Sequence, residues 1–128
     1  MDDQPPDQLL DVAHACFDFA RQGDAIRLSA YVARGVPVDL TDAQGNTLIM
    51  LAAYHGHAET VRALAASGAD VDRLNDRGQS PLAGAVFKGE DDVVRVLLAA
   101  GADPDQGTPS PRATAAMFGR EDLIPADG

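Results

Sequence analysis

The residues best suited to chemistry in this chain are its histidines and its single cysteine. His55 and His57 flank Gly56 and could form a metal-binding pair. A helix presents ligands three or four residues apart, however, and no cysteine or carboxylate pattern completes a site here. His14 and Cys16 lie two residues apart and, on a helix, point to different faces, so they do not predict a nucleophile with its base. We expect Cys16 to be a small core residue.

Two further segments lack the features of a ligand site. Glu90-Asp91-Asp92 has neither the glycine nor the spacing of a calcium-binding loop. Its charge suits the positive N-terminal end of a helix instead. Segment 101–107 contains turn residues but lacks the lysine of a nucleotide-binding loop. We therefore expect no metal, no cofactor and no enzymatic activity.

The composition restricts the fold and the partners. Hydrophobic residues make up 45% of the 128 residues and aromatic residues only 5%, so small aliphatic side chains must form the core, which favours closely packed helices. The net charge of −10 disfavours nucleic acid and anionic membranes and favours a basic protein partner. A single cysteine, an acidic N-terminus and the lack of a membrane-length apolar stretch lead us to expect a cytoplasmic protein.

The elements that would position these residues repeat every 33 residues, between blocks 42–74 and 75–107. Such self-similarity is typical of solenoid proteins, in which stacked units share one core. The aligned pairs include Gly45 with Gly78, Thr47 with Ser80, Gly56 with Gly89, Val61 with Val94, and Leu64 with Leu97.

Each block predicts two helices and a turn. The first helix is short, at about 47–55 or 80–88, and begins where a threonine or serine can cap free N–H groups. The second, at about 58–66 or 91–99, carries acidic residues in its first turn. Neither helix pair could bury its apolar face alone, so neighbouring pairs must stack.

Weaker copies of the pattern flank the two blocks. The sequence therefore predicts an all-α solenoid of two full repeats between two degenerate caps, the first cap starting with a helix at about 8–21. The expected divisions are a disordered tail over 1–7, a cap over 8–41, repeats over 42–74 and 75–107, a cap over 108–124, and a C-terminal tail over 125–128.

Short motifs recur at fixed places in both blocks. They are Gly45-Asn46-Thr47, Gly56-His57 and Gly68-Ala69-Asp70 in the first, and Ser80-Pro81-Leu82, Gly89 and Gly101-Ala102-Asp103 in the second. These motifs resemble the ankyrin repeat, which implies helix pairs with hairpin-like turns, a structural role for His57 and the binding of other proteins. The family's histidine that links neighbouring repeats is absent from both blocks. We expect apolar packing to replace its hydrogen bonds, with modest stability.

The resemblance also implies where a partner would bind, because ankyrin proteins usually use a concave face formed by hairpin tips and the exposed ends of first helices. By position, these are the helix-end residues Arg21, Tyr54, His55, Phe87, Lys88 and Met117 and the hairpin residues Gln44, Asn46, Arg77 and Gln79. Tyr, Phe, Met and Arg are enriched at interfaces. The alternative is that Tyr54 and Phe87 fold back over their own repeat, and we expect Phe118 to plug the core of the last cap.

The expected function is a protein-binding module that acts as an inhibitor, an adaptor or a masking protein. An alternative is a structural role, in which an apolar end near Ile124 stacks on another copy and gives weak self-association. Gly84 lies inside a short helix, where it costs on the order of 1 kcal/mol relative to alanine. We expect tight packing against the adjacent helix to explain it, and backbone access for a partner is the alternative.

Overall fold

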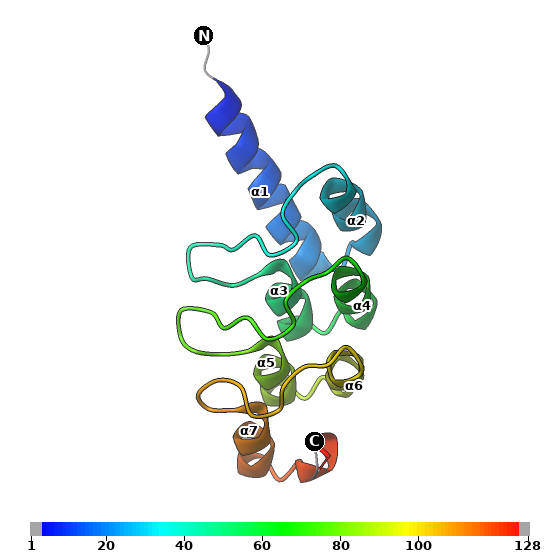
Figure 1. Ribbon diagram of the computed structural model, residues 1–128, viewed down its shortest axis with the longest axis vertical. Helices are drawn as coiled ribbons and strands as arrows, with labels where there is room; N and C mark the ends of the chain where they lie inside the picture. Colours follow the sequence, from blue (N-terminus) through cyan, green and yellow to red (C-terminus); the bar gives the residue numbers. More distant parts are fainter. Residues whose placement is uncertain (1–3, 126–128) are drawn as a thin grey trace.

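The computed structural model describes the backbone of residues 4–125, with side chains from residue 10 onward, as helix pairs stacked in one row (Figure 1). One column holds α1, α3, α5 and α7 and the other holds α2, α4 and α6, while the hairpins project from the first column. The helices are α1 (Gln4–Gln22), α2 (Ala25–Ala33), α3 (Leu48–Tyr54), α4 (Ala58–Ala66), α5 (Pro81–Lys88), α6 (Asp91–Ala99) and α7 (Pro111–Met117), followed by the 3-10 helix η1 (Glu121–Leu123). The described residues form no β-structure beyond one isolated bridge, and none of their helices is long and apolar enough to cross a membrane.

Hydroxyl side chains cap the first helices, as predicted. Thr47, Ser80 and Ser110 each accept a hydrogen bond from the backbone N–H three residues later, at 3.2, 3.1 and 3.0 Å. The second helices α4 and α6 begin without a side-chain cap but carry acidic residues in their first turns. Their bounds, 58–66 and 91–99, are those predicted from the sequence. The first helices of the full repeats, 48–54 and 81–88, agree within one residue at each end.

The core lies between the two columns and is aliphatic. Within it α3 packs against both α1 and α5, and α4 packs against both α2 and α6. Cys16 is fully buried, as predicted, and this burial raises the pKa of its thiol, whereas His14 on the same helix is exposed. The side chains exposed by no more than 1% include Leu28, Leu48, Ile49, Val61, Leu82, Val93, Val94 and Leu97.

Hydrogen bonds as well as apolar contacts join neighbouring repeats. The Asp70 N–H donates to the carboxylate of Asp39 at 2.9 Å, and 33 residues later the Asp103 N–H donates to Asp72 at 2.8 Å. Each bond reaches from one repeat to the turn of the previous one. Besides the apolar packing expected in place of the family's histidine, side chains in the turns therefore link neighbouring repeats.

His57 has the structural role that the resemblance implied. Its Nε2 lies 2.7 Å from the carbonyl oxygen of Arg21 and so ties the first full repeat to the N-terminal cap. Gly23 makes room for this ring: it has a φ of +77°, and a Cβ there would lie 2.6 Å from Nδ1 of His57. A side chain at Gly23 would therefore clash with the ring and strain the backbone.

One sequence-based expectation about the caps is wrong, and Ile124 in the last cap is buried. Helix α1 begins at Gln4, so residues 4–7 of the expected disordered tail are helical. Pro5 and Pro6 lie in its first turn, where a missing N–H is tolerated. Ile124 is only 5% exposed, because η1 packs against both α6 and α7 and carries Ile124 into the core, so this residue does not form an exposed apolar end. The expected tails at 1–3 and 126–128 lie outside the described residues.

Candidate protein-binding groove

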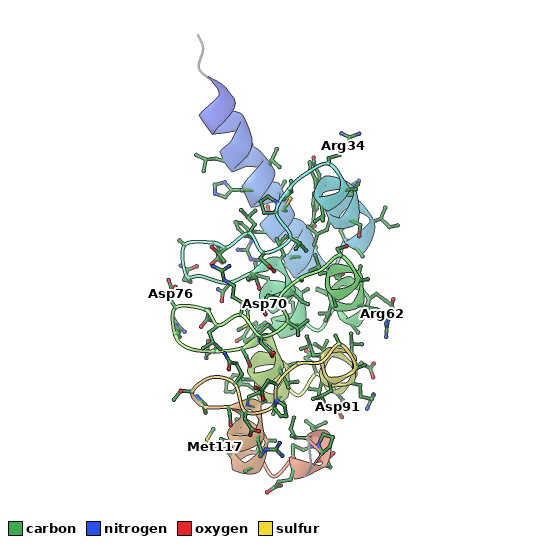
Figure 2. The ribbon with its side chains drawn as sticks, viewed as in Figure 1. Arg34, Arg62, Asp70, Asp76, Asp91 and Met117 are labelled. Carbon is green, nitrogen blue, oxygen red and sulfur yellow. The ribbon has the colours of Figure 1, made fainter. Side chains whose placement is uncertain are left out.

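A groove of about 840 Å³ runs along the first helices, between their C-terminal ends and the hairpins. We call it the concave groove. Figure 2 shows Asp76 and Met117 on this side of the molecule, away from Arg62 on α4. Of the ten predicted binding residues, nine line the groove and Lys88 does not. The nine are Arg21, Gln44, Asn46, Tyr54, His55, Arg77, Gln79, Phe87 and Met117.

Three large apolar side chains are exposed along the helix-end wall. Tyr54, Phe87 and Met117 come from α3, α5 and α7 and are 38%, 56% and 66% exposed. They occupy equivalent places because each lies at or next to the last residue of its helix. The alternative that Tyr54 and Phe87 fold back to fill gaps in their own repeats is therefore not what the structure shows.

Residues of the next repeat support the two aromatic rings. Nζ of Lys88 lies 4.5 Å from the centroid of the Tyr54 ring, and Phe118 packs edge-on against Phe87 with centroids 5.6 Å apart. Neither Lys88 nor Phe118 lines the groove, so each ring is held from outside it. The expectation that Phe118 plugs the core is wrong: it is 50% exposed and lies directly after the last residue of α7, next to Met117.

Met50 and Gly84 form part of the groove floor between the two rings. A Cβ built on Gly84 would lie 3.4 Å from Cε of Met50 and 3.7 Å from Cδ1 of Tyr54, which are ordinary van der Waals distances. Tight helix packing therefore does not require a glycine at this position, contrary to our expectation. Met50 was not predicted as a groove residue, since an apolar residue at a helical core spacing gives no signal that its edge reaches a surface.

The hairpin wall is built from two matching turns. The Asp42 carboxylate accepts the N–H groups of Gln44 and Asn46 at 3.0 and 2.9 Å. In the next turn Asn75 accepts the N–H groups two and four residues later, both at 3.0 Å, and its amide also donates to Oδ1 of Asn46 at 2.8 Å. Asn75 was missed in the sequence, although it stands 33 residues after Asp42.

Two of the four predicted hairpin contacts already accept hydrogen bonds from the side-chain amide of Asn75. These acceptors are Oδ1 of Asn46 and Oε1 of Gln79, the latter at 3.1 Å. Gln44 and Arg77, at the tips of the two turns, are exposed. Of the four predicted hairpin contacts, Gln44 and Arg77 are therefore the two most accessible to a partner.

Basic side chains lie at and beside the helix-end wall. Arg21, His55 and Lys88 lie at the C-terminal ends of α1, α3 and α5, where a cation meets the negative end of the helix dipole. Burial lowers the pKa of His55, and the nearby His57, Lys88 and Arg21 lower it further. Arg21 also pairs with Asp18 at 3.0 Å. Basic groups from three helices thus converge at one edge of the groove.

The opposite, outer face is formed by the second helices and differs in kind. Arg62 pairs with Glu59 on α4, and Arg95 pairs with Asp92 on α6. These pairs flank a shallower hollow of about 540 Å³ between the two helices. Over the described residues, no three His, Cys, Asp or Glu side chains gather as a metal site.

Comparisons with known proteins match this repeat geometry. Residues 15–108 match the family model for ankyrin repeats in three copies. Over 65 residues the chain is 43% identical to a protein of Pseudomonas aeruginosa whose name describes it as an ankyrin repeat protein. The match covers 48% of this chain and 38% of that relative, so the chain spans well under half of the relative's length. Ankyrin repeats are generally protein–protein interaction modules. With three quarters of its length in the family match, this chain belongs to the ankyrin-repeat family.

Proposed function

We propose that this chain binds a protein partner through the concave groove. The observation that carries the proposal is the exposure of Tyr54, Phe87 and Met117 along one wall of a single groove. Large apolar side chains at the centre of a concave surface supply most of the binding energy at protein interfaces. Since the two aromatic rings are already supported from outside the groove, little side-chain ordering is needed on binding, and this lowers the entropic cost.

The partner we propose is a protein of net positive charge. The chain carries 20 acidic and 10 basic residues, so its long-range field attracts a basic protein and repels nucleic acid and anionic membranes. Such attraction speeds the first encounter more than it strengthens the final complex. A free, buried cysteine is consistent with a reducing compartment, and we propose that the protein acts in the cytoplasm.

The proposed mechanism is the covering of a partner's surface by a preformed groove. Such binding would inhibit the partner, mask one of its sites or connect it to another protein. No reaction on the partner is part of this proposal, because the groove presents apolar side chains, amides and paired charges in place of a nucleophile with its base.

The test is an affinity capture from native lysate with three proteins side by side: the wild type, Tyr54→Ala/Phe87→Ala and Arg62→Ala/Arg95→Ala. Circular dichroism first checks that both variants keep the helical fold. We expect proteins captured by the wild type to be retained by the outer-face variant and lost by the groove variant. Capture that is equal for all three proteins would refute binding through the groove.

A further inference from the structure

The concave groove has local charges that differ from those of the whole chain. Most of the acidic residues that give the net charge of −10 lie outside the groove. The ionisable residues that line it are Arg21, His55, Arg77, Asp42 and Asp76. The net charge therefore describes how a partner approaches, whereas these local groups decide which side chains fit once it arrives.

Arg21 and His55 line the helix-end wall, Lys88 lies behind that wall, and Arg77 lines the hairpin wall. The ring of His55 lies edge-on to Tyr54 with centroids 5.5 Å apart, and Nζ of Lys88 lies 4.5 Å from the centre of the same Tyr54 ring. A group that contacts Tyr54 from the groove thus lies beside His55, with Arg21 on the same wall, while Lys88 holds the ring from outside the groove. Burial lowers the pKa of His55, and the nearby His57, Lys88 and Arg21 lower it further, so basic side chains lie close to this ring.

The acidic groups lie on the facing wall, and one of them is already satisfied. The Asp42 carboxylate accepts two N–H groups of its own turn, so it is fixed in place by the hairpin. Asp76 is exposed on the next hairpin, beside Arg77. On the hairpin wall Asp42 and Asp76 repel a ligand carboxylate and Arg77 attracts it, whereas the helix-end wall has basic side chains and no acidic residue among its lining residues, which favours that wall for the carboxylate.

The floor provides room for one apolar side chain. Gly84 has no side chain, and a methyl group there would meet Met50 and Tyr54 only at ordinary contact distances. Glycine inside a helix costs about 1 kcal/mol relative to alanine, and the packing of α3 on α5 does not require it. The empty position lies between two exposed rings, Tyr54 and Phe87, which come from successive repeats.

We propose that the partner segment bound in the groove places an apolar side chain over Gly84, between Tyr54 and Phe87, and a neighbouring carboxylate against the edge that Arg21 and His55 line and Lys88 flanks from outside. This inference rests on the proposed function and narrows it to a class of partner segment, an exposed stretch in which an apolar residue stands next to Asp or Glu. The partner as a whole can still be basic, since this requirement concerns only the segment in the groove.

The experiment is a selection from a phage-displayed library of random peptides, first on the wild type and then on variants. We expect enriched peptides to combine an apolar residue with a nearby Asp or Glu. Synthetic copies of these peptides should bind Gly84→Leu about tenfold more weakly, because the leucine fills the floor. Gly84→Ala adds one methyl group and should give a smaller loss, so the test remains valid if the leucine variant does not fold.

Two substitutions of Lys88 distinguish the contribution of its charge to binding from that of its packing. Lys88→Arg keeps the cation near Tyr54 and should keep the affinity, whereas Lys88→Met keeps an unbranched side chain without the charge and should weaken binding about threefold to tenfold at low salt. This loss should shrink as salt is added, since screening removes the attraction that the wild type gains.

Each other outcome overturns a stated claim. Selection of basic peptides, equal binding to Gly84→Leu, or no enrichment would overturn the inference about the segment. If the affinity capture described above still discriminates the groove variant, the proposed function survives that result. Peptides that bind Tyr54→Ala/Phe87→Ala as well as they bind the wild type would count against both.

Discussion

The concave groove and the outer face are made from the same repeat, yet their side chains are satisfied in different ways. On the outer face Arg62 and Arg95 each pair with a carboxylate one turn earlier on the same helix. In the groove the side chains at the helix ends, such as Phe87, are apolar and exposed, and their nearest support comes from the next repeat. A surface whose charges are already paired gains little from a partner, whereas an exposed apolar surface gains burial.

The helices that carry the groove and those of the outer face also differ in how they begin. Helices α3, α5 and α7, which carry most of the helix-end wall, have only seven or eight residues and begin with hydroxyl caps such as Thr47. Helices this short are not stable alone in water, so caps and packing must hold them. The second helices α4 and α6 have nine residues and no side-chain cap. The position of the groove therefore depends on a few short-range bonds that the outer face does not need.

The largest expected effect is a loss of partner affinity that differs between two substitutions in the same repeat. Phe87→Ala should weaken the affinity for a captured partner by about tenfold or more, since it removes a large exposed ring from the centre of the groove. Arg95→Ala, on the outer face of the same repeat, should leave the affinity within about twofold. Isothermal titration calorimetry measures both, and equal losses would end the distinction between the two faces.

The next largest effect is on stability and concerns the residues that cap the N-terminal ends of the helices. Thr47→Ala should lower the free energy of unfolding by about 1–2 kcal/mol, because it leaves the buried Met50 N–H without its acceptor. Thr47→Ser keeps the hydroxyl and is the matched control for the lost bond. Glu90 stands at the N-cap position of α6, but its side chain makes no capping hydrogen bond. Glu90→Ala should therefore lower the free energy of unfolding by no more than about 0.5 kcal/mol. Urea unfolding followed by circular dichroism compares the three, and a larger loss for Glu90→Ala would contradict the account.

Gly84 should behave opposite to the turn glycines. Gly84→Ala should stabilise the protein by up to about 1 kcal/mol, because the residue is helical and its methyl group has room. Gly45→Ala is the contrasting variant: its φ is +77°, and a Cβ would lie 2.4 Å from Oδ1 of Asp76, so it should destabilise. Thermal unfolding of both variants checks the sign, and a destabilised Gly84→Ala would mean that the floor is closed in solution.

The ion pairs of the outer face should contribute little to stability. Arg62→Gln/Arg95→Gln should change the free energy of unfolding by less than about 1 kcal/mol, since both pairs are exposed and lie one helical turn apart. The difference between the variant and the wild type should decrease further at high salt. Chemical unfolding at low and high salt measures it, and a loss well above that bound would show that this face is held together by its charges.

The smallest expected effect is a dependence on pH. The pKa of His55 is lowered in the folded protein, so the unfolded chain binds this proton more readily. Its contribution to stability is therefore present above the ordinary value near 6.5 and is lost as the pH falls through that value toward the folded pKa. His55→Gln should remove this part of the pH profile. A wild-type stability that rose as the pH fell through this range, and did so less in His55→Gln, would have the wrong sign.

Much of the fold could be predicted because local signals mark it. A hydroxyl cap before an apolar run gave the starts of α3 and α5 to within one residue. Acidic residues at a helix start and a glycine after its end gave the bounds of α4 and α6 to the residue. The start of α1 was missed because Pro5 and Pro6 suggested a boundary after themselves, whereas both fit inside a first turn. The burial of Ile124 was not predicted, because it depends on how η1 returns to the stack.

The candidate groove could be predicted only in outline. Family positions brought nine residues to one surface, since a fixed period places equivalent residues in a row. The contacts of Lys88 with Tyr54 and of Phe118 with Phe87 could not be predicted, because they depend on the distance between stacked repeats and on side-chain rotamers. Asn75 is an intermediate case, because its spacing from Asp42 was visible but its bond to Asn46 was not.

The most direct test of the central claim is photo-crosslinking at matched positions on the two faces. A benzophenone amino acid replaces Phe87 in one variant and Arg95 in the other, both in the same repeat, and each protein is irradiated in native lysate. The account predicts a discrete crosslinked protein from position 87 and none from position 95. Crosslinks to a discrete protein from position 95, with none from position 87, would contradict it and move the binding surface to the outer face.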